Sequence, residues 1–299
     1  MDDIVFFYPH GHEAHFLEGH PERPERIEAA VEGLTESSYW DRYPKIEPIE
    51  ISQEVLLGVH TMPYLSLLET SASRGSFLDG DTYTRPASWQ LALNAAGGAA
   101  ACAVAVWKGR ARRAYALTRP PGHHAGPGYG MGFCLINNIA VAAEYLLKTQ
   151  GAEKLAIVDI DLHHGNGTQD IFYQRSDVLY ISTHQAPFYP GSGEAGERGR
   201  GGGLGTTANI PLPPYSGDEA FRSALDRAIL PLLYRYSPQM LLVSMGFDTH
   251  WIDPLGHLQL CTQVQGELIA ALTAWAEENC GGRITVILEG GYDLDASAA

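Results

Sequence analysis

Four short, almost continuously apolar runs constrain the fold of this chain more than any other feature. They are residues 155–161 (LAIVDID), 178–184 (VLYISTH), 240–248 (MLLVSMGFD) and 284–291 (ITVILEGG). A strand has this composition when both faces of its sheet are covered. Helical patterns lie between the runs, at residues 139–150, 218–236 and 263–279. The alternation predicts an α/β protein, a three-layer sandwich in which helices flank a central, mainly parallel β-sheet.

Composition excludes several functional classes. The sequence has 299 residues and no linker or low-complexity run, so we expect one domain over residues 1–299. A net charge of −15 disfavours nucleic acid and anionic membranes as partners. Segment 87–107 contains Gln90, Asn94 and two glycines, which favours a buried helix over a membrane span. The four cysteines form no CxxC pair, which predicts reduced thiols and a cytoplasmic location.

Polar residues gather where the apolar runs end. Asp161 and His163 follow the first run, His184 ends the second, Asp248 ends the third, and Tyr292 follows the fourth. In open α/β sheets, ligands bind outside the carboxyl ends of the strands. Four strand ends that carry reactive side chains therefore indicate one shared site.

The stretch VDIDLHHGNGTQD, residues 158–170, holds the densest group of potential metal ligands. Alternate residues of a strand point the same way, so Asp161 and His163 can converge on one ion, with Asp159 one step behind. Asp248 is placed to be a third ligand from another strand end. Two carboxylates and one imidazole predict a catalytic divalent site for zinc, although iron(II), cobalt or manganese would also suit it.

Two further features belong beside a catalytic metal. The loop RPPGHHAGPGYGMGFCLINN, residues 119–138, contains His123 and His124, and an imidazole pair suits a general base and acid. Tyr292 follows two glycines in LEGGYD, residues 288–293, and its phenol can donate to a carbonyl that becomes an oxyanion. Each feature is weak alone, but the metal motif strengthens both.

The motifs together resemble the histone deacetylase superfamily, which has the arginase–deacetylase fold. The matching segments are GHPERPERI (19–27), RPPGHHA (119–125), GFCLINN (132–138), VDIDLHHGNGTQ (158–169), FYPGSG (188–193), SMGFD (244–248) and LEGGYD (288–293). HHGNGTQ and LEGGY are more similar to class II enzymes and bacterial histone deacetylase-like amidohydrolases than to class I. Family members normally continue past the last motif, so the resemblance implies a domain without the usual C-terminal helix.

The resemblance implies a role for each candidate residue. The zinc ligands would be Asp161, His163 and Asp248. The catalytic set would be His123 with Asp159, His124 with Asn166, and the carbonyl-polarising Tyr292. Class I enzymes have Asp where this chain has Asn166, and an amide leaves His124 easier to deprotonate than a carboxylate would.

The resemblance also implies bound potassium and a substrate tunnel. One structural K⁺ would lie near Asp159, Asp161, His163, Ser182 and Thr183, and a second near residues 172–178. The substrate tunnel would be lined by Gly132, Phe133 and Tyr189. Leu255 would occupy a rim position at which polyamine deacetylases carry a glutamate.

The expected function is zinc-dependent hydrolysis of N-acetyl amides, most simply acetyl-lysine in peptides or proteins, releasing acetate and an amine. Three alternatives stay open: an amidohydrolase for acetylpolyamines or other small acetylated amines, a non-catalytic acyl-lysine-binding protein, and an arginase-like enzyme with two manganese ions. The sequence does not decide the oligomeric state. The histidine-rich segment 10–20 (HGHEAHFLEGH) could hold another metal, but its spacing favours a loop.

Overall fold

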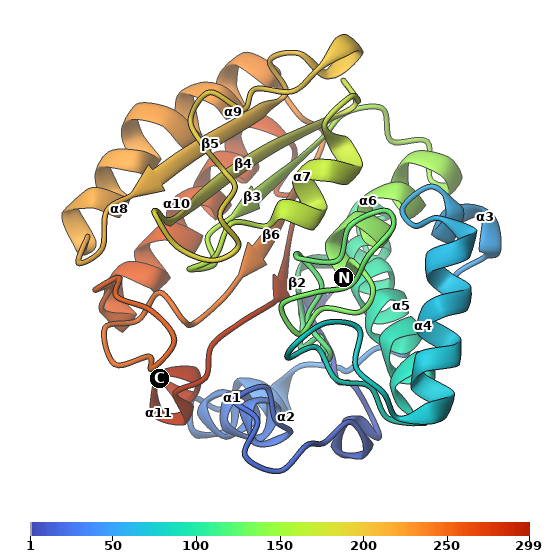
Figure 1. Cartoon of the computed structure of the whole chain (residues 1–299). Coiled ribbons are helices and arrows are strands. Elements are labelled where there is room, and N and C mark those ends of the chain that lie inside the picture. Colours follow the sequence, from blue (N-terminus) through green and yellow to red (C-terminus); the bar gives the residue numbers. More distant parts are fainter. Residues whose placement is uncertain (1) are drawn as a thin grey trace.

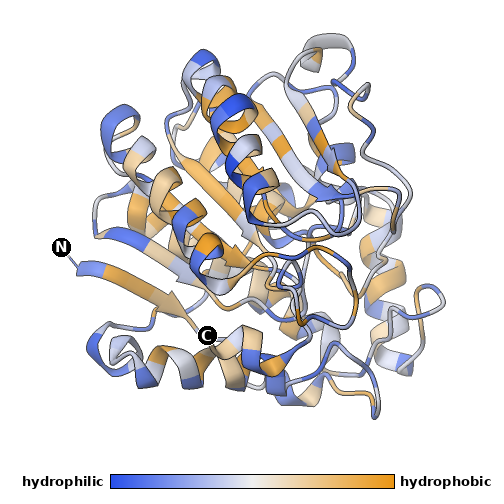
Figure 2. Cartoon of the chain, turned by 90° about the vertical axis from the view of Figure 1, so that its left-hand side faces the viewer, coloured by the Kyte–Doolittle hydropathy of each residue, from blue (hydrophilic) through white to orange (hydrophobic). Residues whose placement is uncertain are grey.

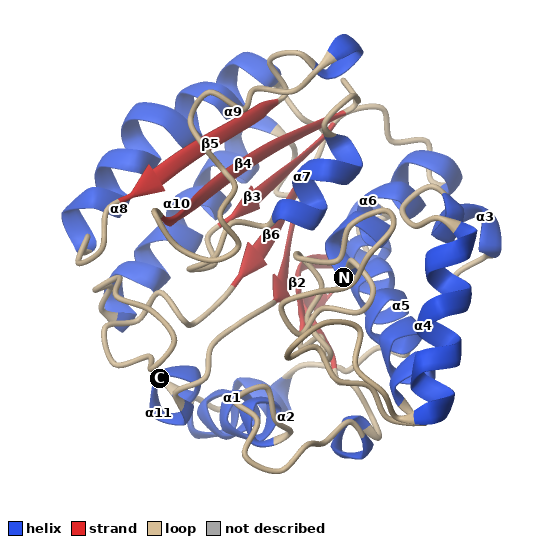
Figure 3. Cartoon of the chain, viewed as in Figure 1, coloured by secondary structure: helices blue, strands red, loops and turns tan. Residues whose placement is uncertain are grey.

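The computed structural model describes residues 2–299, and its strands form one seven-stranded sheet. The strands are β1 (Asp2–Phe7), β2 (Ala111–Ala116), β3 (Leu155–Asp159), β4 (Val178–Gln185), β5 (Thr207–Leu212), β6 (Leu241–Met245) and β7 (Ile284–Leu288). Their order in the sheet is β1-β2-β7-β6-β3-β4-β5, and every neighbouring pair is parallel. The prediction of a mainly parallel sheet is confirmed (Figure 3).

Helices cover both faces of this sheet (Figure 1). The helices are α1 (Glu25–Glu36), α2 (Tyr39–Arg42), α3 (Gln53–Leu57), α4 (Met62–Arg74), α5 (Ser88–Trp107), α6 (Asn138–Thr149), α7 (Asn166–Phe172), α8 (Asp218–Ala224), α9 (Leu230–Tyr236), α10 (Thr262–Asn279) and α11 (Leu294–Ala298). Side chains of α3 to α6 form a core on one face, and those of α8 to α10 form a core on the other. The three-layer sandwich expected from the sequence is therefore present, and apolar colour concentrates inside it (Figure 2).

Three of the four strands that the apolar runs predicted are shorter than those runs. β3 ends at Asp159, β6 at Met245 and β7 at Leu288, so the reactive residues lie in the loops that follow. The predicted helix 218–236 is α8, a π-helical turn (Leu225–Ile229) and α9 in succession. The sequence patterns did not reveal β2 (ARRAYA), which is charged, or the edge strand β5 (TANIPL), which contains a proline.

Helix α5 is the one described helix long and apolar enough to cross a membrane, and 78% of its apolar window is buried inside the protein. It packs against α6, β1 and β2, so it is the buried helix that the sequence predicts. Its close approach to the sheet depends on Gly98, because a Cβ there would collide with the ring of Phe7 in β1. Figure 1 shows α5 and α6 side by side on this face.

We predict that Gly98→Ala destabilises the protein although alanine is the better helix former. Alanine gains about 1 kcal/mol in helix propensity, whereas overpacking a filled core costs about 1–3 kcal/mol. Gly266→Ala is the matched control, since Gly266 lies in α10 and a Cβ added there would meet no atom within 4 Å. Urea unfolding should show a lower midpoint for the first variant and a higher one for the second. Equal stabilisation by both would contradict the packing argument.

Candidate active site

Three adjacent strands bring the predicted site residues together. β7, β6 and β3 are neighbours in the sheet, and all three have their carboxyl ends at the same edge. Asp161 and His163 follow β3, Asp248 follows β6, and Tyr292 follows β7. Residues separated by more than 100 positions in the sequence therefore converge at one place because the parallel register places their strand ends together.

Asp161, His163 and Asp248 form the candidate metal centre. One ligand atom from each lies within 4.8 Å of the others. His163 Nδ1 is 3.2 Å from Asp161 Oδ1 and 3.2 Å from Asp248 Oδ2. All three side chains are almost wholly buried, and the backbone N–H of Leu162 donates to Asp248 Oδ1. The three donors thus converge on one buried point.

The chemistry of these donors fits a bound cation. Burial, reinforced by the carboxylate of Asp161, raises the pKa of Asp248 to about 7. Asp248 Oδ2 also accepts no hydrogen bond from the described residues. Glycines 246 and 290 keep the backbone close, because a Cβ at either would strike these carboxylates. Two buried carboxylates held against each other cost free energy, and a divalent ion would remove that cost.

His123 is paired with a carboxylate. Its Nδ1 lies 3.1 Å from Asp159 Oδ2, an oxygen that also accepts from the hydroxyl of Tyr180. Burial disfavours the charged imidazole, but Asp161 and Asp159 outweigh that effect and raise the pKa of His123 to about 10. Glu289 holds the backbone, since its Oε2 accepts from the N–H groups of Gly122 and His123. The sequence pattern indicated no role for Tyr180 or Glu289.

Cys134 and Glu289 also form a second buried group of potential metal ligands with His123. Glu289 is already used, because it accepts two backbone N–H groups and the hydroxyl of Ser244. Burial raises the pKa of the Cys134 thiol well above its usual value, which disfavours the thiolate that a metal needs. The group of Asp161, His163 and Asp248 is therefore the better candidate for a metal centre.

His124 is paired with an amide. Its Nδ1 lies 2.7 Å from Asn166 Oδ1, which is the partner that the sequence predicts. Burial, together with the neighbouring His123 and His163, lowers the pKa of His124 well below its ordinary value. The two adjacent histidines therefore experience opposite environments.

Tyr292 lies beside the metal centre and is 8% exposed. Its backbone N–H donates to Asp253 Oδ2 over 2.7 Å, and its ring faces Phe133 edge-on with centroids 5.7 Å apart. The guanidinium of Arg26 lies 4.9 Å from the ring centroid and donates to the backbone oxygens of Glu289 and Gly291. Strand β7, Asp253 and Arg26 thus fix the turn that carries the phenol.

Arg26 belongs to a small buried network of ion pairs. Glu22 accepts from Arg26 and Arg119, and all three side chains are at most 2% exposed. Burial raises the pKa of Glu22, but Arg119 and its other cationic neighbours lower it to about 2, so this carboxylate stays ionised. Glu22 and Arg26 belong to the quoted motif GHPERPERI, but the sequence did not show that they pack under the tyrosine turn.

Aromatic side chains surround the approach to the histidines. Tyr189 meets the rings of His124 and His163 edge-on, with centroids 5.3 and 6.0 Å apart. A Cβ at Gly132 would press on the ring of His124, so glycine is required there. Leu255 is partly exposed, and its N–H donates to Asp253, the carboxylate that also holds Tyr292. All four predicted tunnel residues therefore adjoin the site, Leu255 through Asp253 and Phe133 through Tyr292.

The positions predicted for potassium lie at the ends of two paired strands. Asp159 of β3 is in register with Ser182 of β4, and both are fully buried. The hydroxyl of Thr183 donates to the carbonyl of Asp159 over 3.4 Å. The potassium assignment stays a prediction.

The histidine-rich segment 10–20 is a loop with one short 3₁₀ turn, His12–Ala14. His15 contacts Ser88 Oγ and Glu22, and His12 contacts the hydroxyl of Tyr8. These structural contacts agree with the loop interpretation.

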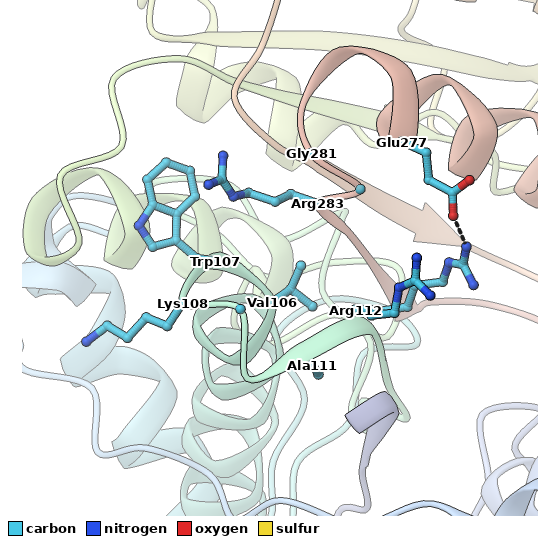
Figure 4. A pocket seen from close by; sticks show the side chains of 11 residues that line it. Val106, Trp107, Lys108, Ala111, Arg112, Glu277, Gly281 and Arg283 are labelled. Carbon is cyan, nitrogen blue, oxygen red and sulfur yellow. Dashed lines mark hydrogen bonds and ion pairs between the residues drawn. The ribbon is translucent and has the colours of Figure 1, made fainter. Parts of the chain in front are cut away.

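One surface hollow lies away from these residues. It has a volume of about 600 Å³ and adjoins the amino ends of β2 and β7. Figure 4 shows Lys108, Arg112 and Arg283 around it, while Glu277 pairs with Arg113. Arg283 lies over the ring of Trp107, 4.9 Å from its centroid. This basic hollow is at the edge of the sheet opposite the candidate active site.

The protein has an arginase–deacetylase fold. It is a three-layer α/β sandwich, and a buried Asp-His-Asp group, a histidine pair and a tyrosine meet at one edge of its sheet. Residues 20–299 match the family described as the histone deacetylase domain, and the chain belongs to this family. The family is generally zinc-dependent, and the chain is a hydrolytic deacetylase.

Named relatives agree with this assignment. The chain is 44% identical to a "Probable deacetylase" of Archaeoglobus fulgidus over 280 residues, covering 93% of this chain and 78% of the relative. It is 42% identical to a "Histone deacetylase-like amidohydrolase" of Pseudomonas aeruginosa over 280 residues, covering 92% and 73%. The crystal structure of the HDA15 HD domain superposes with a TM-score of 0.91 at 38% identity, covering 98% of this chain and 88% of that one.

A pH-dependent prediction follows from His60, which clamps the loop of His123 and His124. His60 Nδ1 lies 2.8 Å from the carbonyl of Gly126, and its Nε2 accepts from the N–H of Asn137. Burial lowers the pKa of His60 to about 4, whereas an unfolded histidine titrates near 6.5. Its stabilisation is therefore complete above pH 6.5 and is lost as the pH falls toward 4, because the unfolded chain binds the proton first.

Between pH 7 and pH 5, wild-type protein should lose about 2 kcal/mol of stability more than His60→Gln does. Urea unfolding at both pH values measures this difference directly. The other buried histidines, His12 and His15 among them, remain in both proteins, so their contributions cancel in the comparison. Parallel losses in the two proteins would show that His60 is not protonated on unfolding.

Proposed function

We propose that the chain hydrolyses N-acetyl amides with one Zn²⁺ held by Asp161, His163 and Asp248. The observation that carries this proposal is the convergence of those three buried donors beside His123, His124 and Tyr292. A bound zinc would supply a Lewis acid for the acetyl carbonyl and for the attacking water. The remaining steps fall to side chains of this chain.

The histidine pair moves the proton. It removes a proton from the attacking water, and His124 then returns a proton to the departing amine. Asp159 and Asn166 hold the two rings through their Nδ1 atoms, which leaves the Nε2 of His124 for this chemistry, while the Nε2 of His123 lies 3.7 Å from Asp161 Oδ1. The phenol of Tyr292 donates to the oxygen that becomes negative. The products are acetate and a free amine.

Tyr292→Phe tests the role of the phenol. Loss of one oxyanion donor costs about 10²–10³ in rate, and we expect kcat to fall by that factor while zinc content stays at one ion per chain. Acetate release and elemental analysis of the same preparation measure the two quantities. Tyr234→Phe is the matched control, because Tyr234 is an exposed residue of α9. A kcat near the wild-type value would remove Tyr292 from the catalytic set.

The preferred substrate is acetyl-lysine in a peptide or protein. An acetyl-lysine side chain is narrow and apolar with a polar end, which suits the substrate tunnel that the family resemblance implies beside Phe133 and Tyr189. Leu255, the expected rim residue, offers no charge to a distal ammonium. Two carboxylates, Asp79 and Asp81, do lie in the loop whose Thr82 hydroxyl accepts from the N–H of Phe133. The free state of all four cysteines in the described chain supports our proposal of a reducing, cytoplasmic location.

Acetate release from an acetyl-lysine peptide and from N-acetylputrescine, measured side by side on zinc-loaded protein, tests this assignment. We expect kcat/KM to favour the peptide by about tenfold or more, which corresponds to about 1.4 kcal/mol or more from contacts that the small amine does not make. Preference for N-acetylputrescine would keep the chemistry and overturn the rim argument. Acetate from neither substrate, with zinc bound, would favour a non-catalytic acyl-lysine-binding role.

A further inference from the structure

We propose that Tyr129 and the exposed Asp170 are positioning residues that fix the tautomer of His124. The inference rests on the proposed function of His124 as the proton-transferring group. It concerns a chain of three hydrogen bonds that runs from the protein surface to the buried imidazole. The structure gives each of its links.

The links are continuous and short. Tyr129 Oη donates to Asp170 Oδ2 over 2.5 Å. Asn166 Nδ2 donates to Tyr129 Oη over 3.0 Å, and Asn166 Oδ1 lies 2.7 Å from His124 Nδ1. The other acceptor near Asn166 Nδ2 is the sulfur of Met131, at 3.4 Å. Both neighbours of the amide nitrogen can therefore act as acceptors.

The direction of every bond follows from Asp170. An ionised carboxylate only accepts, so the single hydrogen of the Tyr129 hydroxyl is committed to it. The phenolic oxygen is then left as an acceptor and takes the N–H of Asn166. The amide must consequently turn its oxygen toward His124. That oxygen only accepts, so His124 carries its proton on Nδ1 and leaves the lone pair of Nε2 free.

The Tyr129–Asp170 pair is needed because residue 166 is an asparagine, whose amide has two different ends. A carboxylate at this position would accept from His124 in either orientation of its side chain. An amide is different, because rotation by 180° about its last bond would present N–H₂ to the ring and select the opposite tautomer. The Tyr129–Asp170 pair makes that rotation unfavourable, since the flipped amide oxygen would face an oxygen with no hydrogen to give.

The local fold is built to hold this pair. Asn166 and Asp170 are four residues apart in α7, so they lie on the same face one turn apart. Tyr129 bridges them from the loop that also carries His124. A Cβ at Gly126 would overlap the ring and hydroxyl of Tyr129, so glycine is what allows the ring to lie there. The backbone N–H of Gly126 donates to the carbonyl of Tyr129 and fixes the turn.

The test uses two variants that act at different links. Asp170→Asn keeps the shape but can donate as well as accept, so both orientations of Asn166 become available. Tyr129→Phe removes the middle link. Asp226→Asn and Tyr234→Phe are the matched controls, because these exposed side chains make no ion pair or side-chain hydrogen bond with any of residues 2–299.

Nitrogen-15 NMR of the histidine rings in zinc-loaded protein is the first measurement, with His124 assigned by loss of its signals in His124→Asn. We expect the Nδ1–H pattern in wild type and both controls, and a mixture of tautomers in Asp170→Asn and Tyr129→Phe. We also expect kcat to fall about tenfold in these two variants, with KM changed by less than about twofold, because proton transfer is affected and binding is not.

An unchanged His124 spectrum in both variants would overturn the proposal, as would a kcat equal to that of the controls. Thermal unfolding of each variant shows whether the fold is retained, and Asp170→Asn alters only an exposed group. The spectrum needs no substrate, so it tests the hydrogen-bond chain even if wild-type protein releases no acetate. Failure of the proposed function and failure of this inference are therefore distinguishable.

Discussion

The repulsion between two buried carboxylates, Asp161 and Asp248, is the constraint on which the rest of the site depends. Parallel strands β3 and β6 place both residues at one sheet edge, where the surrounding core excludes water. His163 lies between them, with its Nδ1 3.2 Å from an oxygen of each. Such a cluster is costly unless its charge is offset by a proton or a cation, so a bound metal ion would also stabilise this edge of the sheet.

Buried carboxylates also give the two neighbouring histidines different proton affinities. His123 faces Asp159 and Asp161, so its charged form is stabilised, whereas His124 faces an amide and two other imidazoles, so its charged form is disfavoured. Two chemically identical side chains at adjacent positions therefore acquire different proton affinities from their partners alone. The carboxylates of Asp161 and Asp159 act on His123, whereas burial and the imidazoles of His123 and His163 act on His124.

Much of this could be predicted from the sequence, because the relevant signals are local. The apolar runs showed β3, β4, β6 and β7, and the alternate spacing of Asp161 and His163 indicated one centre. The edge strands β1 and β5 and the charged β2 carried no such signal, since half-exposed strands need no continuous apolar run. The ends of β3, β6 and β7 were placed too late because the loop residues that follow them are also buried, so burial does not mark where a strand ends.

What the sequence could not show is the set of contacts between distant loops. Asp170 follows Asn166 by four residues, but Tyr129 lies in a distant glycine-rich loop, and nothing in the sequence places it between Asn166 and Asp170. Glu22 and Arg26 likewise lie more than 250 residues before the turn that Arg26 holds. Such contacts form only where the backbone of one segment can approach the side chains of another.

Glycines 132, 165, 246 and 290 each lie where a Cβ would strike a histidine or carboxylate of the site. The reacting groups could be recognised from the sequence by their chemistry. How closely they approach one another depends on these glycines, because any larger residue would keep the backbone and the reacting groups apart.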